Sequence, residues 1–162
     1  GNTMDKTIKA VDIFFRFFLA ALSSLLGMLY VPVLLMVLFN VIDYVTGLAA
    51  SKYRDNGKIS SYKSIRGIYK KIGMWLLVIV GAGLDQLILY SVGMFGIDIS
   101  FKFAIACVVT VWICCNEIIS ILENMLDIGI ALPPFLMPLV KYIKKQSEDK
   151  VKFDDEIEGG AK

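Results

Sequence analysis

Long apolar runs with few charged interruptions are the feature that most restricts the fold of this chain. Of its 162 residues, 57% are hydrophobic, and several runs approach or exceed the roughly 18 to 20 residues that cross a bilayer as a helix. The runs do not alternate between apolar and polar positions, as the strands of a membrane barrel would. The sequence therefore predicts an all-α integral membrane protein, with one membrane domain over residues 4–145.

Four membrane-spanning helices are expected, over residues 13–30, 33–50, 67–90 and 101–126. Gly27 and Pro32 predict a break between the first and the second. The first run is just long enough to span, although Arg16 lies near its start. The alternative is that this run lies on the membrane surface, which leaves three spans.

The C-terminal part of the chain has a different character. Residues 135–145 combine apolar positions with Lys141, Lys144 and Lys145. This pattern predicts a short basic amphipathic helix suited to an anionic inner leaflet. Residues 146–162 are rich in charge and are predicted to form a disordered cytoplasmic tail.

Positive charge gathers between the second and third expected spans. Seven cations lie there against one acid, Asp55: Lys52, Arg54, Lys58, Lys63, Arg66, Lys70 and Lys71. By the positive-inside rule, the loop 51–66 and the C-terminus face the cytoplasm. With four spans the N-terminus is also inside, whereas with three it lies outside.

Several classes of chemistry find no support in the composition. The chain has no His, which removes the commonest general base and the commonest metal ligand. Cys107, Cys114 and Cys115 share one apolar run without the spacing of a zinc site, and we expect them to be reduced packing residues. No enzymatic activity, cofactor, metal or nucleic acid is expected.

Three carboxylates lie within the expected spans: Asp43, Asp85 and Glu117. Each would cost about 2.5 to 3.5 kcal/mol near the membrane centre if left uncompensated. Their depths predict a network on the inner side that joins acids and cations of three helices: Asp43, Glu117 and Glu123 with Arg66, Lys70 and Lys71. The simplest interpretation of such pairs is that they hold the helices of one subunit together.

Asp85 lies farther from the basic loop, and the sequence places no cation near it. A carboxylate without a partner avoids lipid. We therefore expect Asp85 to face either another subunit or a water-filled lumen.

Three blocks of the chain resemble the phage holin family of the toxin-secretion/phage-lysis type. They are LFNVIDYVTGLAA (38–50), SSYKSIRGIYKKIGM (60–74, followed by Asp85) and NEIISILENMLDIGIALPPFL (116–136). The blocks occur in order within residues 34–145. One departure is that Pro133 and Pro134 are adjacent, whereas the family pattern separates them by a residue.

The resemblance implies structural and assembly roles for the positions that match the family's motifs: Asp43, Gly47, Gly67, Lys70, Lys71, Asp85, Asn116, Glu117, Glu123 and Asn124. Ser120 lies on the same polar side of the fourth expected span.

Such proteins assemble with themselves in the bacterial cytoplasmic membrane into lesions. An endolysin, which need not contact the holin, or in some relatives a large toxin, then leaves the cell. From the residues alone, a small ion channel or transporter with Asp43, Asp85 and Glu117 as ion ligands is the alternative.

Overall fold

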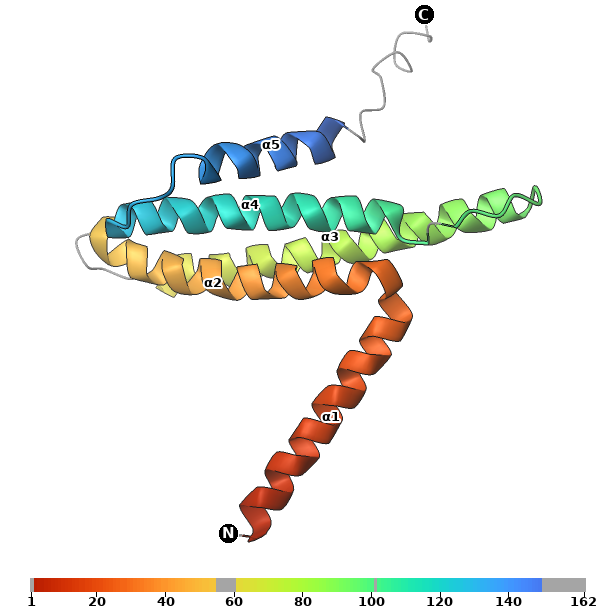
Figure 1. Ribbon diagram of the computed structural model, residues 1–162, viewed down its shortest axis with the longest axis horizontal. Coiled ribbons are helices and arrows are strands. Elements are labelled where there is room, and N and C mark those ends of the chain that lie inside the picture. The colour runs from red at the N-terminus through yellow and green to blue at the C-terminus, as the bar shows by residue number, and fades with distance from the viewer. Residues whose placement is uncertain (1, 55–60, 101, 150–162) are drawn as a thin grey trace, which may run out of the picture.

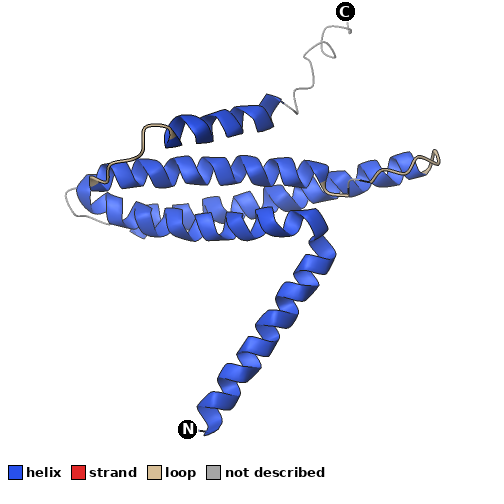
Figure 2. Ribbon diagram, in the orientation of Figure 1, coloured by secondary structure: helices blue, strands red, loops and turns tan. Residues whose placement is uncertain are grey.

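The computed structural model describes residues 2–54, 61–100 and 102–149, and these residues form helices and loops without strands (Figure 2). The prediction of an all-α fold is thus confirmed. In chain order the elements are α1 (Asn2–Leu26), the short 3₁₀ helix η1 (Gly27–Leu29), α2 (Tyr30–Arg54), α3 (Ser61–Gly93), α4 (Ala104–Ile128) and α5 (Leu136–Asp149).

Helix α4 lies at the centre of the bundle and packs along α2, α3 and α5, whereas α2 and α3 contact one another little (Figure 1). An apolar cluster joins α2, α3 and α4 at the end of the bundle where α4 begins. Its buried members are Leu29, Met36, Val78, Ala106, Ile113 and Cys114. The bundle therefore depends on α4 as its common packing surface.

Three helices are long and apolar enough to cross a membrane: α2, residues Ser64–Gly93 of α3, and α4. The first expected span, residues 13–30, is not among them. Its residues are divided between α1, η1 and the start of α2. The apolar part of α1, residues 13–26, is about 21 Å long at 1.5 Å per residue, which is short of the roughly 30 Å hydrocarbon core. The structure thus supports the three-span alternative.

The break between α1 and α2 lies where Gly27 and Pro32 predict it. Gly27 has a φ of +53°, a left-handed conformation that glycine adopts at no steric cost. Pro32 stands in the first turn of α2, where its missing N–H breaks no helical hydrogen bond. Helix α1 leaves the bundle at this break at a steep angle (Figure 1).

Helices α3 and α4 approach most closely at Gly81, which is buried. A Cβ atom at this position would lie 3.2 Å from Cα of Ala106. Ala106 belongs, with Thr110 and Cys114, to a ridge of small residues at i, i+4 and i+8 that the sequence predicts as a packing edge. All three are buried, which confirms the prediction and places the ridge inside the subunit.

Helix α4 ends at Gly129, which has a φ of +96°. The N–H groups of Gly129 and Ile130 donate to the carbonyls of Leu126 (3.0 Å) and Met125 (2.9 Å), a common way to satisfy the last carbonyls of a helix. After this turn the chain reverses, and α5 runs back along α4 (Figure 1).

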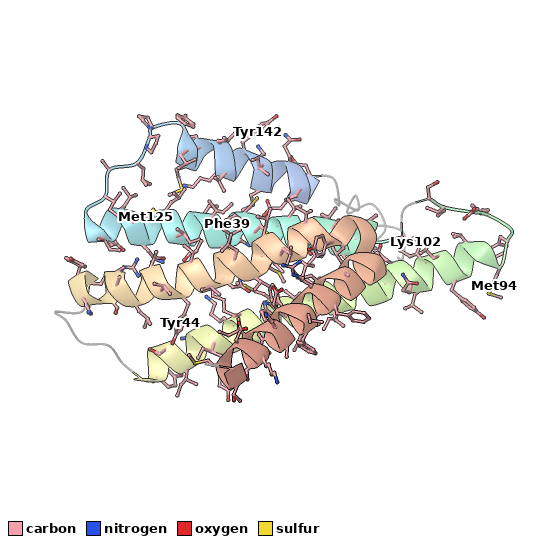
Figure 3. The ribbon with its side chains drawn as sticks, turned by 60° about the horizontal axis from the view of Figure 1, so that its bottom comes forward. Phe39, Tyr44, Met94, Lys102, Met125 and Tyr142 are labelled. Carbon is pink, nitrogen blue, oxygen red and sulfur yellow. The ribbon has the colours of Figure 1, made fainter. Side chains whose placement is uncertain are left out.

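The basic amphipathic helix expected near the C-terminus is present as α5. Its apolar face, however, lies on α4, where Val140 packs with Cys115 and Leu122, and it is not free for the inner leaflet. The helix also continues past the expected boundary at residue 146 to Asp149, and in this last turn Glu148 accepts a hydrogen bond from Nε1 of Trp112 on α4 at 2.9 Å. The rest of the expected disordered tail, residues 150–162, lies outside the described residues. Tyr142 is on the face of α5 turned away from α4 (Figure 3).

The close approach at Gly81 generates a matched test. Gly81→Leu should lower the free energy of unfolding by about 1–3 kcal/mol, because the new side chain meets the backbone of α4. Gly83→Leu should leave it within about 0.5 kcal/mol, since nothing lies within 4 Å of a Cβ at that position. Unfolding of the detergent-solubilised protein by SDS measures both. Equal effects of the two substitutions would contradict this packing.

Candidate functional site

A lysine shared by two carboxylates lies at the centre of the polar interior. Nζ of Lys71 on α3 pairs with Oδ2 of Asp43 on α2 and with Oε2 of Glu117 on α4. Glu117 is only 2% exposed, and the side chains of the other two are less than one-fifth exposed. One ammonium group therefore ties three helices together. The pairing of these three residues agrees with the network that the sequence predicts.

Two side chains extend this triad toward the apolar cluster. Nδ2 of Asn40 donates to Oε2 of Glu117 at 3.0 Å. The indole Nε1 of Trp75 in turn donates to Oδ1 of Asn40 at 2.6 Å. Asn40 thus uses its amide as a bridge between an ionised and a neutral partner, and Glu117 accepts from both Lys71 and Asn40.

Asn124 extends the network toward the ends of α2 and α4. Its Nδ2 donates to Oδ1 of Asp43 at 3.1 Å and to Oγ1 of Thr46 at 3.0 Å. Its Oδ1 accepts from Arg54 at 2.8 Å, and Nε of Arg54 pairs with Asp127. We call the connected set of nine residues the charge cluster: Asn40, Asp43, Thr46, Arg54, Lys71, Trp75, Glu117, Asn124 and Asp127.

An open cleft of about 460 Å³ borders the charge cluster between α2, α3 and α4. Small residues make room for it: Gly47, Ser51, Ser64, Gly67 and Ser120. Gly47 lies beside Asn124, and a Cβ atom at this position would be in ordinary contact with its Nδ2 at 3.6 Å. A Cβ atom at Gly67 would lie 3.9 Å from the ring of Tyr44. Charged and small side chains thus share one surface near the loop that joins α2 to α3.

The other residues that the sequence predicts for the site or the charged network lie around this cleft or away from it. Asn116 and Lys70 line the cleft. Arg66, Lys70 and Glu123 are exposed, and none of them forms an ion pair with another described residue. Their predicted membership of the charged network is therefore wrong, because Lys71 is the cation that pairs with Asp43 and Glu117.

The basic positions near the loop are partly visible. Lys52 and Arg54 are exposed at the end of α2, and Lys141 and Lys145 on α5. Nζ of Lys144 lies 5.7 Å from the ring centroid of Trp112, a cation–π geometry. Lys58 and the side chain of Lys63 lie outside the described residues.

Asp85 has partners that the sequence did not predict. Its Oδ1 and Oδ2 accept the backbone N–H groups of Ile105 and Ala106, each at 2.9 Å. These two N–H groups belong to the first turn of α4, which has no acceptor inside its own helix, and a negative charge at this end is favourable. Asp85 is 5% exposed. It thus caps a neighbouring helix, and the expectation that it faces another subunit or a lumen is wrong for this structure.

Several residues of the charge cluster could have been found from helical spacing. Asn40, Asp43 and Arg54 fall at i, i+3 and i+14, on the face of α2 that carries Gly47. Asp127 follows Glu117 by ten residues on one side of α4, and Trp75 follows Lys71 by four on α3. The spacing shows that these side chains share faces, but the choice of Arg54 over Arg66 as a partner depends on how the three helices are arranged.

Within the described residues, no three His, Cys, Asp or Glu side chains lie close enough together to hold a metal ion. The same part of the chain contains no buried side-chain nitrogen or oxygen without a hydrogen-bond partner. The charge cluster is thus a closed set of pairs that stabilises the arrangement of α2, α3 and α4.

Three apolar helices that enclose a set of paired charges define this chain as a multi-pass helical membrane protein. A sequence profile of the bacteriophage holin family matches residues 20–145, a range that includes every residue of the charge cluster. The chain therefore belongs to the bacteriophage holin family. This is a family of holins and not of enzymes.

Individual relatives are similar over most of the chain. The uncharacterized protein Lmo0128 of Listeria monocytogenes is 29% identical over 91% of this chain and 100% of its own length. The uncharacterized protein Lin0175 of Listeria innocua is 32% identical over 81% of this chain and 84% of its own length. A probable holin of Bacillus phage phi105 is 27% identical over 77% of this chain and 83% of its own length. No solved structure matches the chain.

Removal of the shared ammonium tests the charge cluster. Lys71→Met should lower the free energy of unfolding by about 3–5 kcal/mol, because Asp43 and Glu117 remain buried without a cation. The triple variant that also carries Asp43→Asn and Glu117→Gln should recover most of this loss, since no buried charge is then left uncompensated. SDS-induced unfolding in detergent measures all variants.

Lys70→Met is the matched control for this test, because Lys70 is the exposed neighbour of Lys71. Its effect should stay within about 0.5 kcal/mol. If Lys70→Met destabilised the protein as much as Lys71→Met, the assignment of Lys71 as the shared partner would be wrong.

The cap on α4 generates a second comparison. Asp85→Leu should cost about 2–4 kcal/mol of unfolding free energy, because two N–H groups of α4 lose their acceptors in a medium that offers no water. Gln86→Leu changes an exposed neighbour and should be close to neutral. Hydrogen exchange at Ile105 and Ala106 should accelerate in the first variant alone. Unchanged exchange there would contradict the capping role.

Proposed function

We propose that this protein is a lesion-forming holin, which assembles with itself in the bacterial cytoplasmic membrane and lets an endolysin reach the cell wall. The observation that carries the proposal is the family match over residues 20–145. A probable holin from a Bacillus phage among the relatives supports it. Release of a large toxin by the same kind of lesion is the second form that this function can take.

The distribution of charge is consistent with a subunit that accumulates singly in lipid before it assembles. The outward faces of α2 and α3 are apolar, with exposed residues such as Leu38, Val41, Leu76 and Val80. The intramembrane acids Asp43, Asp85 and Glu117 are paired inside the subunit. An isolated copy therefore presents hydrocarbon to hydrocarbon, and lipid does not force it to oligomerise at once.

The proposed orientation places the loop 51–66 and the C-terminus in the cytoplasm. Exposed Lys52, Arg54 and Arg66 lie at that end of the bundle, as the positive-inside rule requires. Lys141 and Lys145 are also exposed, on α5, which packs along α4 from the same end of the bundle. With three spans, the N-terminus then lies outside.

An ion channel or transporter that uses the intramembrane carboxylates is the competing proposal, and the open cleft beside the charge cluster is what favours it. Against it, Lys71 already occupies the space between Asp43 and Glu117. Asp85 is bound to the backbone of α4. A cation would have to displace Lys71 before either carboxylate could bind it.

Co-expression in bacteria with an endolysin that lacks a secretion signal tests the proposal. Culture turbidity should fall abruptly when both proteins are present and should not fall with the endolysin alone. Lys71→Met should delay or abolish this fall, because the variant subunit is destabilised, whereas Lys70→Met should lyse on time. A slow loss of membrane potential with the endolysin retained inside would favour the channel instead.

A further inference from the structure

Helix α1 is the one long described helix that stands apart from the bundle. It leaves the start of α2 at a steep angle, and its N-terminal end lies far from the other helices (Figure 1). Its contacts with the bundle are confined to the junction with η1 and α2. Helices α2, α3 and α4 run roughly side by side, so their common direction approximates the membrane normal. The axis of α1 is oblique to that direction.

The charges of α1 form a single stripe. Asp5, Lys9, Asp12 and Arg16 fall at i, i+4, i+7 and i+11, which places them on one face. Neighbours along the stripe pair with each other, Asp5 with Lys9 at 3.2 Å and Asp12 with Arg16 at 2.9 Å. The stripe is thus nearly self-compensating. Lys6 lies beside it, where a long side chain can still reach water.

The remaining faces of α1 are apolar and aromatic. Phe14 and Phe17 are 73% and 77% exposed, and six other large apolar side chains of α1 are also exposed. They are Met4, Ile8, Val11, Ile13, Phe15 and Phe18. An uncovered patch of this extent does not persist in water. One side of α1 therefore needs an apolar medium, while the stripe needs water.

We propose that α1 lies in the plane of the membrane, with its aromatic faces in the lipid and its charged stripe toward water. It occupies the leaflet at the end of the bundle opposite the loop between α2 and α3, which is the outer leaflet in the orientation proposed above. The headgroup boundary offers both environments that α1 requires along its whole length.

A lipid surface fits α1 better than a second copy of the chain as the occupant of these faces. The charges of the stripe are already paired within the helix, so they leave little to recognise an opposite charge on a partner. The apolar surface extends around most of the helix and carries bulky Phe side chains, whereas close helix pairs in membranes use small residues at the contact. The inference holds whether or not the assembled protein opens lesions.

Cysteine labelling of the full chain in its native membrane tests the proposal. In a background with Cys107, Cys114 and Cys115 replaced by Ala, single cysteines are placed on the stripe (Lys9→Cys, Asp12→Cys, Arg16→Cys) and on the aromatic side (Phe14→Cys, Phe18→Cys). Lys52→Cys and Phe95→Cys mark the two ends of the bundle. Spheroplasts are treated with a membrane-impermeant maleimide before and after permeabilisation.

The proposal predicts that labelling depends on which face of α1 carries the cysteine. The three stripe positions should label from the same side as Phe95→Cys, and labelling should be lost at positions 14 and 18. If instead position 9 labels from the side of Lys52→Cys, and positions 12 to 18 are all protected, α1 crosses the membrane and the proposal fails.

Two further outcomes would also overturn it. Labelling at all five positions would mean that α1 stands in water. Protection of all five would mean that protein covers both faces, as in a helix pair between copies. A second set of variants keeps the test independent of local unfolding: Phe14→Asp with Phe18→Asp should make Val11→Cys newly reactive, whereas Asp12→Asn with Arg16→Gln should leave Val11→Cys protected.

Discussion

The ammonium group of Lys71 is the interaction on which the rest of the bundle depends. It is the only described cation that contacts acids of both α2 and α4, and α2 and α3 have few contacts of their own. In lipid, apolar surface alone does not drive helices together, because the tails are as apolar as the side chains. The amides of Asn40 and Asn124 then complete the coordination of the two carboxylates. One side chain thus joins three helices that the packing along α4 already brings together.

Because the polar groups of the described interior are satisfied within one chain, the subunit is complete before it meets another copy. Asp85 illustrates this point, since a carboxylate that looks unpaired along the sequence serves as the cap of α4. Self-association must therefore use the apolar outer faces, or exchange internal pairs for equivalent pairs between subunits. A holin that accumulates before it assembles, as proposed above, would need subunits with this property. The charge cluster explains the stability of the single copy more directly than it explains the assembled state.

The sequence predicts the helical class, the break at Gly27 and the Asp43–Lys71–Glu117 triad. The helical class depends on composition and the break on one left-handed glycine. The triad depends on the equal depth of its three residues along neighbouring helices. The first span did not follow, since hydropathy over residues 13–30 ignores that the helix begins at Asn2 and ends at η1. The partners of Asp85 were inaccessible for another reason. The sequence does not show which backbone N–H groups a carboxylate binds. Along the bundle axis, α4 begins beside Gly81 and Asp85 of α3 and not beside the last turn of α3. The packing of Gly81 against Ala106 sets this offset. Arg54, and not Arg66, joins the charge cluster because of the way α2 and α3 are rotated about their axes. Spacing along one helix does not show this rotation.

The long separation of the paired residues along the chain has a consequence for synthesis. Glu117 follows Lys71 by 46 residues, so it leaves the ribosome roughly 2 to 9 s later at 5–20 residues per second. The first turn of α4 follows Asp85 by about 20 residues. During these intervals Lys71 already has Asp43 as a partner, whereas Asp85 has none of the backbone N–H groups that it binds in the folded chain. Insertion of α3 and α4 together as a hairpin would spare Asp85 an interval in lipid without its partners.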